Sequence, residues 1–105
     1  MTMYEVTHYW VRQDGEGMET RKRAYFTSKD KAIDLCRDWA KDMPILIEVR
    51  PNYDIVFGIR IWNESEGRLY NDRNFVFYET YMGGKRYGWA DYPTKDFFKS
   101  YGYII

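Results

Sequence analysis

The sequence contains a single cysteine, Cys36, and a single histidine, His8. One cysteine cannot form a disulfide within the chain, and it cannot supply a zinc site built from several cysteines. A chain without a disulfide framework is typical of a reducing compartment. We therefore expect no metal site and no cofactor.

Long hydrophobic runs and an excess of one charge are also missing. No stretch without a charged residue exceeds six residues, and the first residues lack the basic and apolar regions of a secretory signal peptide. These features predict a cytoplasmic protein that makes no contact with a membrane. The 16 basic and 16 acidic side chains balance, whereas proteins that coat nucleic acid carry a strong basic excess. A local basic patch is still compatible with this balance.

Aromatic residues, in contrast, are abundant: the chain has 11 Tyr, 6 Phe and 4 Trp. Aromatic side chains fit the half-buried surface of a sheet, so this composition predicts a β-rich domain. Tyrosines beyond the needs of a core also suit a binding surface, because they offer a large contact area at a low entropy cost. A length of 105 residues predicts a single domain over residues 1–105.

The stretch from Phe26 to Pro44 predicts the principal helix, over Thr27–Met43. At 100° per residue, its apolar side chains fall on one arc and most of its charged side chains on the opposite side. Thr27 is a candidate N-cap, with Asp30 in the capping-box position, and Pro44 disfavours helical backbone at Met43. We expect a long amphipathic helix packed on one face of a sheet.

Strand patterns flank this helix on both sides, and a short second helix is expected within Pro93–Gly102, capped by Thr94. Arg68–Tyr70 is a candidate for one further brief strand. The element order β-β-α-β-β-β-β-α indicates an α+β fold with a mostly antiparallel sheet. The predicted strands are Met3–Arg12, Met18–Phe26, Ile45–Arg50, Ile55–Trp62, Phe75–Met82 and Lys85–Tyr92.

The first two strands form a hairpin whose register follows from its faces. One register keeps the apolar side chains on one face: it pairs Tyr4 with Phe26 at one end and Trp10 with Thr20 at the other. A shorter, two-residue loop would instead place Trp10 opposite Glu19. Because a slip of one residue moves a strand's side chains to the other face, we prefer the first register.

His8 and Cys36 are the candidates for nucleophilic chemistry. In the preferred register His8 faces the helix that carries Cys36, so a Cys–His pair is conceivable. Cys36, however, lies on the apolar stripe, where a free cysteine behaves as a small hydrophobic residue. The chain has no glycine-rich phosphate loop. We predict no catalytic residue; the carboxylates that could pair for acid–base chemistry are Glu64, Glu66, Glu79 and Asp91.

One face of the first hairpin interleaves aromatic and basic residues. Such a surface can stack unpaired bases and hold a phosphate backbone. The same pattern also describes an ordinary solvent-exposed face, and Glu5 and Glu19 would weaken its positive potential. The residues of this face are Tyr9, Arg21, Arg23 and Tyr25.

A second surface surrounds the turn expected at Gly83-Gly84, with a bulge expected at Gly88. Its residue types are those that favour protein interfaces, although one sheet face can hold only half of their side chains. The alternative is a plain hairpin whose aromatic residues fill the core. The predicted partner-binding residues are Tyr81, Met82, Lys85, Arg86, Tyr87 and Trp89.

A strand followed by Phe26-Thr-Ser-Lys-Asp-Lys-Ala32 and an amphipathic helix resembles many small α+β proteins of phages and mobile elements. This resemblance assigns no role to any residue. We expect a non-catalytic domain, monomeric or homodimeric, that occludes a larger protein partner, such as a host enzyme or defence nuclease. The alternatives are a single-stranded nucleic-acid binder that uses the aromatic and basic face, and an enzymatic or small-ligand pocket.

Overall fold

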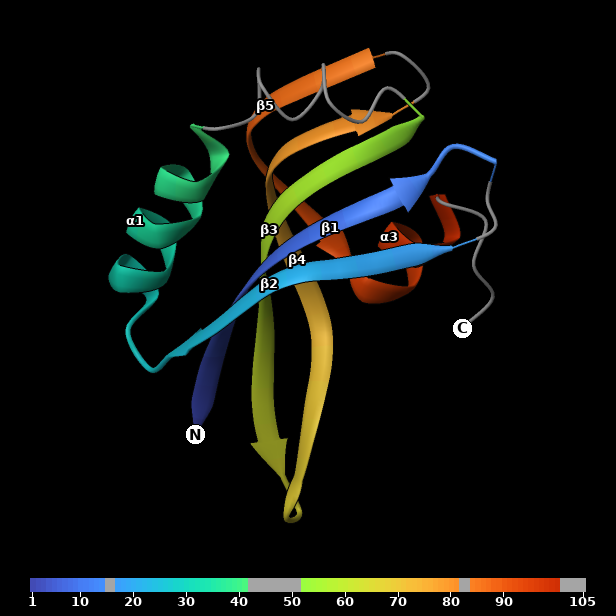
Figure 1. The fold of residues 1–105 in the computed structure, drawn as a ribbon. Coiled ribbons are helices and arrows are strands. Elements are labelled where there is room, and N and C mark those ends of the chain that lie inside the picture. Colours follow the sequence, from blue (N-terminus) through green and yellow to red (C-terminus); the bar gives the residue numbers. More distant parts are fainter. Residues whose placement is uncertain (15–16, 42–51, 82–83, 101–105) are drawn as a thin grey trace.

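Five strands form one antiparallel sheet in the spatial order β2-β1-β3-β4-β5, with a helix on each face (Figure 1). The computed structural model describes residues 1–14, 17–41, 52–81 and 84–100. The mostly antiparallel α+β architecture is confirmed for these residues. The elements are β1 (Thr2–Arg12), β2 (Met18–Phe26), α1 (Lys29–Ala40), β3 (Tyr53–Ser65), β4 (Arg68–Tyr81), β5 (Gly84–Pro93) and α3 (Thr94–Ser100).

The prediction of one long helix was wrong, because α1 has only 12 residues. Its N-cap is Ser28, not Thr27: Ser28 has an extended backbone, and its hydroxyl accepts a hydrogen bond from the Lys31 amide at 3.4 Å. A shift of one residue removes Asp30 from the capping-box position. Lys41 caps the C-terminal end, and the predicted end at Met43 lies outside the described residues.

The element order also differs from the prediction. The strand predicted to end at Trp62 continues to Ser65 as β3, and β4 runs unbroken from Arg68 to Tyr81. Only Glu66 and Gly67 lie between the strands; both have a positive φ, as the type I′ turn of a two-residue hairpin requires. The polar residues beside this turn remain extended because the partner strand satisfies their backbone groups. The predicted strand Ile45–Arg50 lies outside the described residues.

The register of the first hairpin combines both alternatives. The preferred pairing holds from Tyr4 with Phe26 to His8 with Lys22, and then shifts. Trp10 lies opposite Glu19, so the predicted pairing of Trp10 with Thr20 was wrong. The extra residue in β2 is Arg21, which makes this a β-bulge. Because the bulge adds one residue to β2, the β2 side chains that precede Arg21 lie on the opposite face of the sheet from the one predicted.

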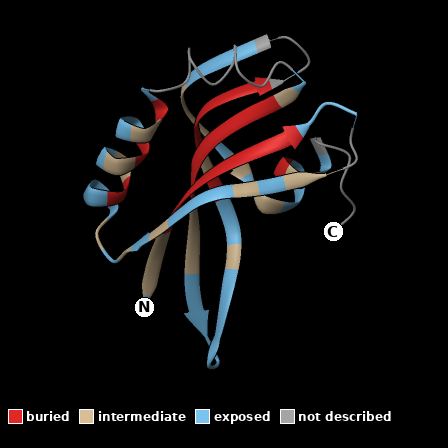
Figure 2. Cartoon of the chain, viewed as in Figure 1, coloured by how far each residue is buried: buried red, intermediate tan, exposed pale blue. Residues whose placement is uncertain are grey.

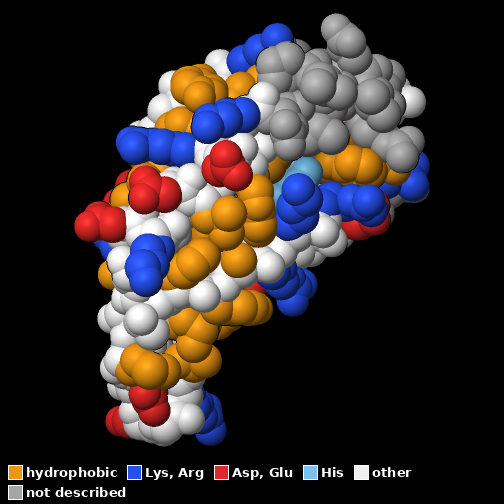
Figure 3. All heavy atoms as spheres, turned by 60° about the vertical axis from the view of Figure 1, so that its left-hand side comes forward, with side chains coloured by type: hydrophobic (Ala, Val, Ile, Leu, Met, Phe, Trp, Pro, Cys, Tyr) orange, Lys and Arg blue, Asp and Glu red, His pale blue; other side chains and the backbone are white. Residues whose placement is uncertain are grey.

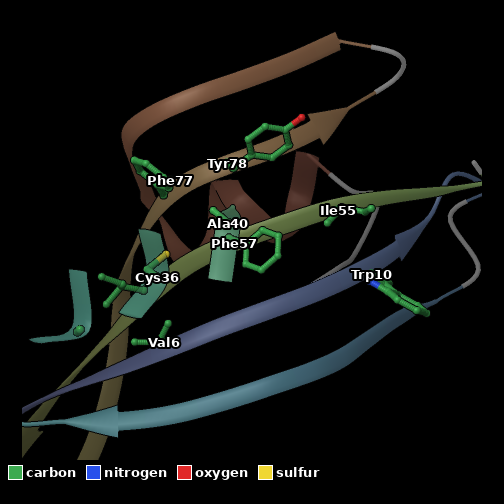
Figure 4. Packing of buried hydrophobic residues seen from close by; sticks show 10 residues of the cluster. Val6, Trp10, Cys36, Ala40, Ile55, Phe57, Phe77 and Tyr78 are labelled. Atoms are coloured by element: carbon green, nitrogen blue, oxygen red, sulfur yellow. The ribbon is translucent and has the colours of Figure 1, made fainter. Parts of the chain in front are cut away.

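Two clusters of buried side chains pack on opposite faces of the sheet (Figure 2). On the α1 face, Cys36 and Ala40 of the helix pack with Val6, Phe57 and other buried residues (Figure 4). Alternate residues of β3, such as Ile55 and Phe57, contribute to this side because successive side chains of a strand point to opposite faces. Each fully buried aliphatic or aromatic side chain contributes about 1.5–3 kcal/mol, so the α1-face cluster is a principal source of stability.

The α3 face has the second cluster, in which Phe97 packs beside Tyr9, Val56 and Val76. The predicted short C-terminal helix is therefore confirmed. Thr94, expected as its cap, is instead its first residue, and its hydroxyl accepts a hydrogen bond from the Asn74 side chain at 2.9 Å. This bond ties the start of α3 to β4.

Candidate functional site

An apolar pocket lies where the first half of α1 crosses the sheet on the side of β5. Its volume is about 200 Å³, and five elements contribute to it. Hydrophobic side chains gather beside lysine and arginine on this side of the molecule (Figure 3). We call this cavity the α1–β5 pocket; it is lined by Tyr4, Lys29, Ile33, Ile59, Ile61, Phe75 and Trp89.

One wall of the pocket is a stripe of α1. Lys29, Ile33 and Arg37 are four residues apart and therefore lie on one side of the helix. The Lys29 ammonium lies 5.4 Å from the centre of the Phe75 ring, and the Arg37 guanidinium lies 5.8 Å from that of Phe77. Both distances are within the range of cation–π attraction. The stripe thus places two cations along an aromatic surface.

The opposite wall belongs to β5. The rings of Tyr87 and Trp89 lie 4.8 Å and 4.9 Å from that of Phe77, measured between centroids. The predicted bulge at Gly88 is confirmed: the pairing with β4 shifts between Val76 and Tyr78, and Gly88 has φ +128°. Tyr87 is 68% exposed although it rests on two rings. It is therefore an aromatic side chain held in place and open to solvent.

The structure separates the predicted partner-binding residues. Tyr87 and Trp89 face the pocket side, whereas Arg86 lies on the α3 face, where it pairs with Glu79 at 3.6 Å and donates a hydrogen bond to the Tyr92 hydroxyl. Lys85 is exposed. Gly84, expected in the turn, is the first residue of β5. Met82, Gly83 and the side chain of Tyr81 lie outside the described residues.

Of the residues that line the pocket, only Trp89 was predicted as a site residue. The other six are Tyr4, Lys29, Ile33, Ile59, Ile61 and Phe75, and Phe77, whose ring supports Tyr87 and Trp89, was not predicted either. The signal that could have identified part of the site is the stripe of α1 that includes Lys29 and Ile33. A cation and an apolar residue four apart on the edge of an amphipathic helix border both the core and the solvent.

The aromatic and basic face predicted for nucleic acid is not one surface. Tyr9 is only 4% exposed: it packs beside Phe97 on the α3 face, and its hydroxyl accepts a hydrogen bond from Arg60. Burial raises the pKa of Tyr9. Arg21, the bulge residue, instead lies over the Trp10 ring at 4.1 Å, on the α1 face. The ring of Tyr9 is thus covered, and Arg21 is on the opposite side of the sheet.

The remaining members of that face surround a buried carboxylate. Glu5 accepts hydrogen bonds from the Tyr25 hydroxyl at 2.8 Å and from Trp62 Nε1 at 3.3 Å, and Arg60 Nε lies 3.7 Å away. The hydrogen bond to Glu5 raises the pKa of Tyr25. A carboxylate with these partners is already satisfied, so the cluster has the character of a structural network. Arg23 is exposed on β2 beside it.

The acidic candidates are also apart. Glu64 and Glu66 lie at the far end of the β3–β4 hairpin, whereas Glu79 lies toward its other end beside Arg86. Asp91 pairs with Arg73 at 3.7 Å. Glu79 and Asp91 thus each lie beside an arginine, an arrangement of separate ion pairs and not of two carboxylates placed together for acid–base chemistry.

His8 and Cys36 are both core residues. The His8 ring stacks on Phe57 with 4.0 Å between centroids, and its Nδ1 lies 3.3 Å from the Val56 carbonyl oxygen. Burial lowers the pKa of His8 to about 4 and raises that of Cys36 to about 12. Both side chains are therefore neutral near neutral pH, and a reactive thiolate does not form.

Comparison with known proteins adds no assignment: the chain matches no protein-family model, no curated protein and no solved structure. Over the ranges that the structure describes, no group of three or more histidine, cysteine or acidic side chains could hold a metal ion. Within the same ranges, no helix is long and apolar enough to cross a membrane. The α1–β5 pocket with Tyr87 is therefore the candidate functional site, on geometry alone.

Proposed function

We propose that this chain is a non-catalytic protein-binding domain that occludes a surface of a larger partner protein, and that it binds through the α1–β5 pocket and Tyr87. The observation that carries the proposal is the exposure of Tyr87, at 68%, on a support of two buried aromatic residues, Phe77 and Tyr78. Rigid aromatic side chains beside a pocket are typical of the residues that dominate the energy of protein interfaces.

The size of the pocket supports a protein partner over a small-molecule substrate. Its volume of about 200 Å³ lies below the roughly 300–1,000 Å³ of sites that enclose a ligand of drug size. An apolar cavity of about 150 Å³ is large enough for benzene. The α1–β5 pocket thus has room for one large side chain of a partner.

In its sharpest form, the proposal is that the chain inhibits a host enzyme or a defence nuclease, as a product of a phage or mobile element. A small domain can inhibit by covering a surface without chemistry of its own. The contacts of Glu5, Glu79, His8 and Cys36 agree with this form, because each is explained by packing or by pairing within the fold.

The test compares two exposed tyrosines. The immobilised chain captures partners from a lysate of the cells that express it, and mass spectrometry quantifies them for the wild type, for Tyr87→Ala and for Tyr70→Ala. Tyr70 is 45% exposed at the far end of the β3–β4 hairpin and serves as the matched control. We expect a stoichiometric partner whose affinity falls by about tenfold or more in Tyr87→Ala and is unchanged in Tyr70→Ala.

The purified partner is then assayed for its own activity with increasing amounts of the chain. Loss of that activity, with Tyr87→Ala a weaker inhibitor than the wild type, supports occlusion. A partner that both variants retain equally would refute the proposed surface, and a lysate that yields no stoichiometric partner would refute the proposed function.

A further inference from the structure

The side of α1 that faces the α1–β5 pocket carries two positive charges, those of Lys29 and Arg37. In the described parts of the chain, no carboxylate lies within ion-pair distance of Lys29 or Arg37, whereas Arg73 pairs with Asp91 on the nearby strands. Both cations instead lie over aromatic rings of the pocket side. The cavity is therefore lined mostly by apolar side chains, and the helix α1 that borders it carries the positive charges.

The spacing of the two cations sets the length of the segment that could meet both. Lys29 and Arg37 are eight residues apart on α1, which corresponds to about 12 Å along the helix axis. An extended chain covers about 12 Å in roughly four residues. A short segment can thus place one side chain in the pocket and carboxylates against both cations.

We infer that the segment bound here is an acidic stretch of a partner protein that inserts one large apolar side chain into the α1–β5 pocket. This inference rests on the proposed function and adds the chemistry of the partner. Charge complementarity favours an acidic segment, because carboxylates can pair with Lys29 and Arg37. Asp30 and Asp34 lie further round the helix and are exposed, so they limit the cationic strip on its outer side.

The first experiment selects ligands without assuming a sequence. A random library of peptides of about twelve residues, each able to extend over about 40 Å, is panned against the immobilised chain and counter-selected against Trp89→Ala. We expect the enriched peptides to be acidic and to share a tryptophan, phenylalanine or leucine. Circular dichroism and a thermal melt establish that Trp89→Ala is folded, and Trp89→Leu provides a milder change of the same wall.

The second experiment measures the role of charge with a matched pair of variants. Lys29→Glu and Lys31→Glu change the net charge equally in the first turn of α1, and both side chains are exposed, but only Lys29 lines the pocket. The affinities of the enriched peptides are measured by fluorescence polarisation. We expect Lys29→Glu to weaken binding by about tenfold or more and Lys31→Glu by less than about twofold.

The outcomes separate the inference from the proposed function. Enriched peptides that depend on Trp89 but are basic or neutral would overturn the acidic partner and leave the proposed function standing. Equal effects of Lys29→Glu and Lys31→Glu would do the same. A dimer in solution that Trp89→Ala disrupts would assign the pocket to a second copy of the chain and overturn the inference. Failure to obtain any peptide that depends on Trp89 would count against both.

Discussion

The buried histidine predicts a specific loss of stability in acid. His8 is 3% exposed, stacks on Phe57 with an interplanar angle of 3°, and lies 3.3 Å from the Val56 carbonyl oxygen through Nδ1. Its pKa falls from 6.5 to about 4: burial is the largest cause, the bond to Val56 opposes the shift, and the charges of Lys22 and Arg21 add to it. The folded protein therefore resists protonation of His8.

The sign and size of the effect follow from linkage. Between about pH 6.5 and pH 4, the unfolded chain binds a proton at His8 that the folded chain does not, so the free energy of unfolding falls as the pH falls. With a pKa of 6.5 in the unfolded chain and about 4 in the folded chain, acidification from about pH 7.5 to about pH 4.5 lowers the free energy of unfolding by about 2.5 kcal/mol. This is a large part of the roughly 5–15 kcal/mol that stabilises a typical domain.

The assay is urea unfolding at a series of pH values, followed by circular dichroism, for the wild type and for His8→Phe. Phenylalanine keeps a ring against Phe57 and cannot titrate, so the difference between the two proteins isolates His8 from the carboxylates that both share. We expect the wild type to lose about 2.5 kcal/mol relative to the variant on acidification. Parallel pH profiles, or an imidazole that titrates near 6.5 by NMR in the folded protein, would refute the reasoning.

Two further predictions test local features by the same urea assay. Ser28→Ala should cost about 1 kcal/mol because it removes the N-cap of α1, whereas Thr27→Ala should change stability by less than about 0.5 kcal/mol; the reverse order would contradict the observed start of the helix. Gly58→Ala should cost about 1–3 kcal/mol, because its Cβ would lie 2.7 Å from the Phe75 carbonyl oxygen. Gly17→Ala is the control, since its Cβ meets no atom nearer than 3.8 Å. Equal losses of stability in the two variants would show that the clash with the Phe75 carbonyl oxygen is not the reason why Gly58→Ala is destabilised.

Local patterns predicted much of the fold because they depend on neighbours in the chain. The alternation over Ile55–Trp62 indicates a strand with one face on the core, and that face does pack on α1. Pairing of Tyr4 with Phe26 follows from the same period of two. The apolar stripe of α1 placed Cys36 in the core, where it lies, because helical periodicity and burial act on the same residues.

Only the tertiary structure decided which side chains are open to a partner. The bulge at Arg21 moves its guanidinium to the opposite face from Tyr9, and the docking of α3 covers Tyr9 itself. Neither event has a marker in the alternation of residues. The α1–β5 pocket likewise joins side chains from five elements, and their distance in sequence leaves no periodic signal. The sequence by itself thus determined the α+β class and the apolar faces of α1 and β3, because these depend on local periodicity. The lengths of the elements, the bulge in β2 and the candidate site depend on how the elements meet in space.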